Sequence, residues 1–170
     1  GWSVSLNADG DLEITGEYNY ASGSSRVMSV SAKDFTGGYD DDWENGWNAK
    51  YSFFNSPNDT YPISVAGLSL PDGAVISSIT AYIKDEYQYS NYRPKIYFVK
   101  VKMTDGNYNA TDAEMTGTSN NIEPLTISNI NTTINNTEYS YYLKFQSHQS
   151  GGTDVRLYGV KITYTVTKAD

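Results

Sequence analysis

The chain has 170 residues, a net charge of −8 and no cysteine, and 16 of its residues are tyrosine. This length can bury the core of one domain without covalent cross-links, and the lack of thiols excludes disulfides and zinc–thiolate sites. The negative charge argues against binding to a nucleic-acid backbone or to anionic lipid, because each needs a positive protein face.

Membrane insertion is not expected either, since no apolar run approaches the roughly 18 residues of a spanning helix. The sequence begins with Gly1, and no signal-peptide pattern follows, so we expect a processed protein or an excised domain. Tyrosine and threonine suit half-buried strands, and abundant Asn, Gly and Ser supply turns, a composition typical of virion or extracellular β-proteins.

The first 25 residues predict a β-hairpin followed by a link. Apolar and polar residues alternate on both sides of Asp9-Gly10, as in two strands joined by a two-residue turn. Residues 21–25 are small and serine-rich, which predicts a flexible link. We therefore expect residues 1–25 to be an N-terminal appendage, and residues 26–170 to be the main domain.

The main domain shows strand-type alternation and no helical periodicity. Long loops are expected at residues 36–48 and 85–93, and residues 111–121 are poorly patterned. The expected strands lie at residues 26–35, 50–54, 63–68, 75–84, 95–103, 125–128, 132–134, 139–145 and 155–166. Antiparallel strands without crossover helices predict an all-β fold, a two-sheet jelly-roll sandwich. The expected core consists of Met28, Val30, Ile79, Ile83, Val99, Val101, Tyr141, Leu143, Val160, Ile162 and Tyr164.

The last strand changes its apolar phase at Gly159. Val155 and Leu157 precede the glycine on one face, whereas Val160 and Ile162 follow it on the other. A one-residue slip would turn half of these side chains toward water. The simplest repair is a β-bulge at Gly159, where glycine can adopt a backbone conformation that other residues avoid.

Three segments resemble a known kind of domain: residues 70–76 (LPDGAVI), residues 136–143 (NTEYSYYL) and residues 156–162 (RLYGVKI). Together they resemble the jelly-roll domain at the C-terminal end of phage tail-fibre-like and bacterial surface proteins. Residues 10–16 (GDLEITG) are similar to the short β segments that precede such domains in phage fibres. The resemblance implies the fold and a virion or extracellular location. It transfers no binding residues.

An acidic run follows Tyr39 in the first long loop, and its carboxylates are Asp40, Asp41, Asp42 and Glu44. Calcium takes six to eight oxygen ligands from such loops, but the spacing differs from that of the EF-hand. The run is therefore interpreted as a solvated acidic loop, with a calcium site as the alternative. No other cofactor is expected.

Aromatic residues gather in the same loop and in a second one. The candidate ligand-binding residues are Tyr39, Trp43, Asn45 and Trp47 in the first loop and Tyr87, Tyr89 and Tyr92 in the second. Aromatic faces flanked by polar groups can stack on sugar rings and bind their hydroxyls. The alternative is that these rings cap the ends of the sandwich or pack between subunits.

No arrangement of residues points to catalysis. His148 is the only histidine and has no plausible partner nearby in sequence, and no pair of carboxylates is singled out for glycoside cleavage. We therefore expect a non-enzymatic structural or adhesive module of a phage tail fibre or surface fibre, homotrimeric, with a cell-surface glycan as candidate receptor. The alternatives are a carbohydrate-binding module of a secreted enzyme and a self-assembling filament subunit.

Overall fold

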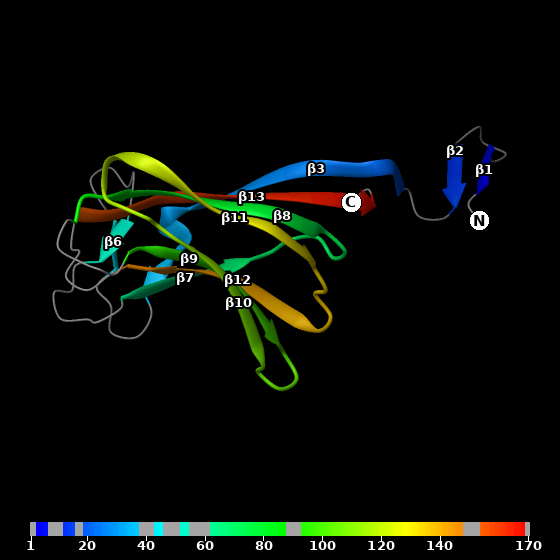
Figure 1. Ribbon diagram of the computed structural model, residues 1–170. Helices are drawn as coiled ribbons and strands as arrows, with labels where there is room; N and C mark the ends of the chain where they lie inside the picture. Colours follow the sequence, from blue (N-terminus) through cyan, green and yellow to red (C-terminus); the bar gives the residue numbers. More distant parts are fainter. Residues whose placement is uncertain are drawn as a thin grey trace.

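The computed structural model is a two-sheet antiparallel β-sandwich of jelly-roll type, which confirms the fold expected from the sequence (Figure 1). The residues that the structure describes are 3–6, 12–15, 19–37, 43–45, 52–54, 62–87, 93–147 and 154–168. Within this described part, no helix has the length and apolarity that crossing a membrane would require.

The strands form two main sheets. The five-stranded sheet has the order β10 (Tyr108–Glu114), β9 (Lys95–Lys102), β12 (Tyr139–Gln146), β7 (Ile63–Leu68) and β4 (Thr36–Gly37). The other sheet has the order β11 (Ser119–Thr133), β8 (Val75–Asp85), β13 (Val155–Lys168), β6 (Ser52–Phe54) and β5 (Trp43–Asn45). Its sixth strand, β3 (Asn19–Ser31), also pairs with β13.

Two strands share one edge of β13 because the chain turns away between them. β3 pairs with β13 as far as Ser31↔Gly159, and β6 takes the same edge at Ser52↔Leu157. The 3-10 helix η1 (Ala32–Asp34) makes the turn and begins with a capping box. In it the Ser31 N–H donates to Asp34 Oδ2 at 3.0 Å, and the Lys33 N–H donates to Ser31 Oγ at 3.2 Å.

The predicted N-terminal hairpin is present as β1 (Ser3–Leu6) and β2 (Leu12–Thr15), in a two-stranded sheet of their own. The prediction of a two-residue turn at Asp9-Gly10 was wrong, since Leu6 pairs with Leu12, a register that such a turn does not allow. A two-residue turn at Asp9-Gly10 would place Val4 opposite Thr15. The observed register places it opposite Ile14, so apolar side chains pair across the strands.

Two stretches expected as linker or loop instead contain strands. Residues 21–25 lie within β3, where Ser24 pairs with Val166 and Ser25 with Thr165, so the predicted flexible link was wrong. The serines continue as a strand because the long β13 supplies a hydrogen-bonding partner. The loop expected at 36–48 contains β4 and β5. The division into an appendage and a main domain stays a prediction.

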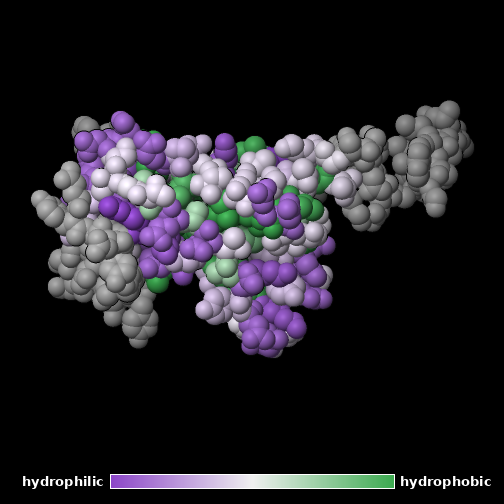
Figure 2. All heavy atoms as spheres, viewed as in Figure 1, coloured by the Kyte–Doolittle hydropathy of each residue, from purple (hydrophilic) through white to green (hydrophobic). Residues whose placement is uncertain are grey.

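The core lies between the two sheets, where hydrophobic residues gather in the view of Figure 2. Most of the predicted core is buried, while Met28 and Tyr164 are half-buried and pack against it. The phase of β9 was wrong: Ile96 and Phe98 face the core, and Val101 is only half-buried. Cross-strand pairing explains this, since Phe98 lies opposite the fully buried Leu143.

Hydrogen bonds join two turns that are far apart in sequence, at residues 70–73 and 134–136. The Asn136 N–H donates to Asp72 Oδ1 at 2.8 Å, and Asn136 Nδ2 donates to the Leu70 carbonyl at 2.9 Å. Gly73 has a φ of +76°, a conformation that favours glycine, and its N–H donates to the Ile134 carbonyl at 2.9 Å. These contacts join two of the segments that carry the resemblance, so their residues serve the fold.

Candidate functional site

A groove on the outer face of the six-stranded sheet is built around Gly159. The register of β13 against β8 shifts between Leu157 and Gly159, so the predicted β-bulge is confirmed. Gly159 has a φ of +158°, and a Cβ atom there would lie 3.2 Å from the Val30 carbonyl oxygen. The bulge lets Leu157 and Val160 both face the core despite their odd and even positions.

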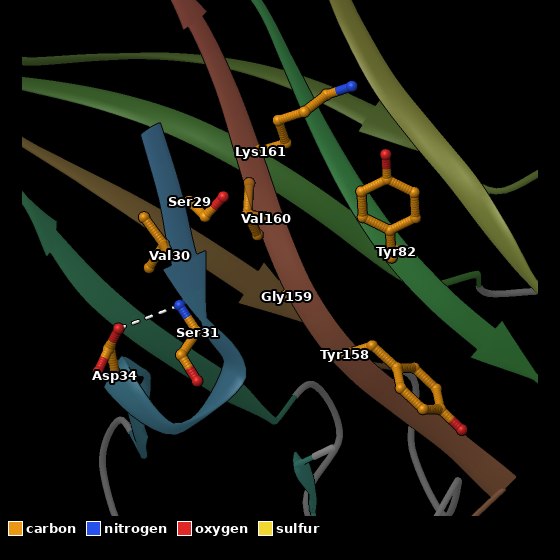
Figure 3. A pocket seen from close by; sticks show the side chains of 9 residues that line it. All are labelled: Ser29, Val30, Ser31, Asp34, Tyr82, Tyr158, Gly159, Val160 and Lys161. Atoms are coloured by element: carbon orange, nitrogen blue, oxygen red, sulfur yellow. Dashed lines mark hydrogen bonds between the residues drawn. The ribbon is translucent and has the colours of Figure 1, made fainter. Parts of the chain in front are cut away.

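The groove has a volume of about 590 Å³, within the range of small-ligand sites. Its lining comes from β3, β8, β13 and η1 (Figure 3): Ser29, Val30, Ser31, Asp34, Tyr82, Tyr158, Gly159, Val160 and Lys161. Figure 3 shows Tyr82 and Tyr158 on one side of the β13 backbone at Gly159, with the β3 serines and Asp34 on the other. The floor is therefore backbone, and the walls are aromatic on one side and polar on the other.

Strand alternation explains why the two tyrosines share this face. Ala81 and Ile83 are fully buried, so Tyr82 between them points outward and remains 36% exposed. Tyr82 pairs directly with Gly159, which has no side chain to cover the ring. Tyr158 precedes the glycine in the bulge and lies on the outer face because Leu157 faces inward.

The polar wall is held in place by the start of η1. Asp34 accepts a hydrogen bond from the Ser31 N–H, so its carboxylate is fixed at the edge of the groove. Lys161 is exposed and pairs with Ser29 across the strands. One carboxylate and two hydroxyls thus line the groove on the β3 side, and the Lys161 ammonium group and two phenol rings line it on the other side (Figure 3). Such a set can bind a polar ring that has both an apolar face and hydroxyl groups.

The outer face of the five-stranded sheet also carries tyrosines, but one ring there is already covered. Lys144 Nζ lies 3.8 Å from the Tyr97 ring centroid, and the Tyr97 hydroxyl donates to Gln146 Oε1 at 3.1 Å. Burial raises the pKa of Tyr97 and lowers the pKa of Lys144. Internal contacts thus engage the Tyr97 ring and its hydroxyl on this face.

Most site residues predicted from the sequence lie outside the described residues: Tyr39, Asp40, Asp41, Asp42, Trp47, Tyr89 and Tyr92. Trp43, Glu44 and Asn45 form β5, an edge strand paired with β6, and only their backbone is described. The predicted aromatic and calcium sites in these loops stay predictions. Among the described residues, no three acidic or histidine side chains group closely enough to hold a metal ion.

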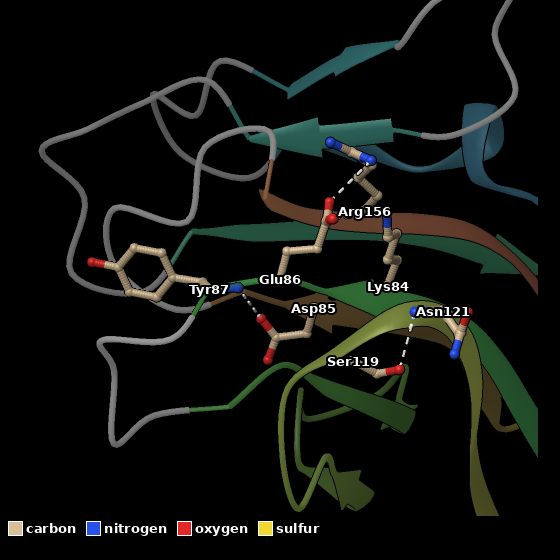
Figure 4. Close-up of polar contacts among 7 residues, drawn as sticks. All are labelled: Lys84, Asp85, Glu86, Tyr87, Ser119, Asn121 and Arg156. Atoms are coloured by element: carbon tan, nitrogen blue, oxygen red, sulfur yellow. Dashed lines mark hydrogen bonds and ion pairs between the residues drawn. The ribbon is translucent and has the colours of Figure 1, made fainter.

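Tyr87, the one candidate of the second loop that the structure describes, contacts Asp85 and the core (Figure 4). Its N–H donates to Oδ1 of the fully buried Asp85 at 3.1 Å, and it packs against the core. Arg93, on the other side of the loop, lies 3.5 Å from Asp85 Oδ2 and donates to the Tyr87 carbonyl at 3.3 Å. A buried carboxylate thus contacts both Tyr87 and Arg93.

Glu86 links the neighbouring strand ends. Its carboxylate lies 2.9 Å from Lys84 Nζ and 3.3 Å from Arg156 Nη1. The hydrogen bond from Lys84, aided by the charges of Lys84 and Arg156, lowers the pKa of Glu86 from its ordinary value. Figure 4 also shows Ser119 Oγ accepting from the Asn121 N–H at 3.0 Å on β11. This end of the sandwich is held by polar contacts, with no nucleophile–base pair among the residues drawn.

The sequence interpretation missed Tyr82 and Tyr158. The available signals were the outward phase of Tyr82 in a strong strand and the position of Tyr158 beside the predicted bulge. Their meeting depends on the pairing of β8 with β13, which no local pattern predicts.

A scan against protein-family models found no match, and no curated protein sequence is significantly similar. Among solved structures, a xylan-binding module, CBM15, aligns with a TM-score of 0.54 and 13% identity, covering 86% of this chain and 100% of that chain. The CBM22-1 and GH10 modules of Clostridium thermocellum endo-1,4-beta-D-xylanase 10B, complexed with xylohexaose, align with a TM-score of 0.56 and 12% identity.

That xylanase match covers 91% of this chain and 30% of the xylanase chain. A bacteriophage CBA120 tailspike protein aligns with a TM-score of 0.43, covering 19% of the tailspike chain, and supports no argument about fibres. At 12–13% identity the two stronger matches show the fold alone. This chain therefore has a jelly-roll β-sandwich fold similar to that of a xylan-binding module.

Proposed function

We propose that this chain is a non-catalytic carbohydrate-binding module that holds a saccharide in the groove around Gly159. The observation that carries the proposal is the pairing of two tyrosine rings with hydroxyls, Asp34 and Lys161 on one rigid sheet face. Sugar rings have an apolar C–H face that stacks on an aromatic ring and a rim of hydroxyls that needs polar partners.

The jelly-roll similarity supports the same function class, because one of the two stronger matches is described as xylan-binding and is spanned completely by this chain. An extracellular location agrees with this proposal and with the composition. A sandwich supplies a stiff backbone, so the ligand-binding side chains lose little further freedom on binding. The proposed role is to bring an attached partner to a polysaccharide, with no chemistry at the groove.

Binding can be measured by native electrophoresis through gels that contain xylan or another neutral polysaccharide, after a glycan array has identified candidates. We expect the double variant Tyr82→Ala with Tyr158→Ala to bind about tenfold more weakly, since each stacked ring contributes about 0.5–1.5 kcal/mol. Unchanged thermal unfolding of the variant is the first control.

Tyr97→Ala is the matched control, because it removes the same kind of ring from the outer face of the opposite sheet. Unchanged affinity in this control, with loss in the groove variant, supports the proposal. Loss of affinity in Tyr97→Ala alone would move the site to the five-stranded sheet. No binding to any glycan by the folded protein would contradict the function itself.

The fibre interpretation, with a homotrimer and a virion location, stays a prediction. Its cheap test is the mass in solution measured by light scattering: a trimer favours the fibre, a monomer the isolated module and a polymer the filament subunit.

A further inference from the structure

A second hollow, of about 370 Å³, lies beside the β9–β10 hairpin and shares no residue with the groove. It is lined by Lys100, Lys102, Asn107, Tyr108, Asn109, Thr132 and Tyr139. Its only charged lining residues are the two lysines, although the chain as a whole carries a charge of −8. The sign of the local charge is therefore opposite to that of the molecule.

The inner face of β9 explains how lysines come to lie there. Ile96 and Phe98 occupy alternate positions in the core, and Lys100 and Lys102 continue the same face toward the strand end. The Phe98 and Tyr141 rings are stacked, with centroids 5.9 Å apart, and Tyr139 follows 6.4 Å from Tyr141. An aromatic row thus runs from the buried core to the rim of the hollow.

The last ring of this row, that of Tyr139, lies beneath the ammonium group of Lys100. Lys100 Nζ lies 3.7 Å from the Tyr139 ring centroid, which holds the ammonium group at the hollow. Among the described residues, no carboxylate lies within ion-pair distance of Lys100, and the ion pair beside this hollow joins Lys102 Nζ to Asp105 Oδ2 at 3.6 Å. That pair is about 40% exposed on both sides, so it is weak and exchangeable.

The β9–β10 hairpin forms the other wall, and backbone hydrogen bonds close its turn. The Lys102 N–H donates to the Asn107 carbonyl at 2.8 Å, and the Gly106 N–H donates to the Lys102 carbonyl at 2.9 Å. This turn holds Asn107 beside the lysines, and Asn109 pairs with Lys100 across the hairpin, so its side chain shares their face. Tyr108 pairs with Val101 instead, so its exposed ring lies on the other face of the hairpin and is not beside the two ammonium groups.

We propose that this hollow binds the carboxylate-bearing sugar of an acidic saccharide, a uronic acid residue. Lys100 and Lys102 pair with its carboxylate, and the amides of Asn107 and Asn109 bind its hydroxyls. Carboxylates elsewhere on the chain oppose this little, because physiological salt screens charges beyond about 8 Å. The sugar class rests on the proposed function, whereas the site and its charge preference are independent of the groove.

The test uses tri-galacturonic acid and its methyl ester, which differ in charge and share the sugar ring. Amide shifts of the ¹⁵N-labelled full chain are followed during titration with each. We expect the acid to shift residues of the β9–β10 hairpin and Tyr139, and the ester to bind at least about tenfold more weakly, since one charge-assisted contact is worth about a factor of ten. Acetate at the same concentration is the second comparison.

The variant Lys100→Gln with Lys102→Gln should lose at least tenfold in affinity for the acid, and Asn109→Ala should lose part of it. Lys95→Gln is the matched control, since it removes the same charge from the opposite face of β9. Equal binding of acid and ester, equal shifts with acetate, or full affinity in the folded double variant would each overturn the proposal. The groove variant Tyr82→Ala with Tyr158→Ala should leave this binding intact, so failure here is distinguishable from failure of the proposed function.

Discussion

Replacing Gly159 by alanine tests the bulge that shapes the groove. A Cβ atom at this position would meet the Val30 carbonyl oxygen at 3.2 Å, closer than most real Cβ contacts. That oxygen belongs to the backbone of β3, where Val30 pairs with Val160, so it cannot retreat without disturbing the ladder. The φ of +158° is also one that residues with side chains rarely adopt.

The expected cost follows from these two observations. A residue forced into a glycine-only backbone region costs about 1–3 kcal/mol. Alanine recovers about 0.4–1 kcal/mol by restricting the unfolded chain, which leaves a net loss of about 1–2 kcal/mol. For a chain of this size, each kcal/mol corresponds to about 2–4 °C in Tm. Urea unfolding of Gly159→Ala should therefore show a lower midpoint with an unchanged slope.

Gly67→Ala is the matched control, because Gly67 also lies in a strand and its Cβ would meet nothing within 4 Å. We expect it to be neutral or slightly stabilising, since only the unfolded-state effect remains. If both variants shift the midpoint by the same amount, the strain argument for the bulge is refuted. Reduced saccharide binding by Gly159→Ala at a temperature where it stays folded would link the bulge to the groove.

Three further predictions concern the core, the charged end and the loops. Leu143→Ala should cost about 2–5 kcal/mol in urea unfolding, because the side chain is fully buried; a midpoint equal to that of the wild type would contradict the strand assignment. Because the pKa of Glu86 is lower in the folded state, its ionised carboxylate stabilises the fold at pH values above the unfolded-state pKa. This contribution is lost as the pH falls through the folded-state pKa, so the difference in Tm between the wild type and Glu86→Gln should disappear in acid. Trp43→Ala with Trp47→Ala tests the predicted loop site: loss of glycan binding with sensitivity to a chelator supports a calcium-assisted site, and full binding by the folded variant removes it.

The alternation of apolar residues located most of the strands but missed β10, and the break in that alternation at Gly159 located the bulge. Both signals are local, since side chains in a strand alternate with period two whatever strand lies alongside. The same alternation left the faces of β9 ambiguous, because Ile96 and Phe98 compete with Val99 and Val101 for the core. Only the pairing with β12 decided between them.

Tertiary structure alone decided where the groove lies and how far β3 extends. Tyr82 and Tyr158 are far apart in sequence and meet because β8 and β13 pair across the sheet. Residues 21–25 look like a linker by composition, yet they form a strand because β13 offers unpaired backbone groups along that edge. Local sequence specifies which side chains share a face. Which faces are buried and which side chains become neighbours depend on long-range pairing, and that pairing minimises exposed apolar surface and unpaired backbone over the whole sandwich.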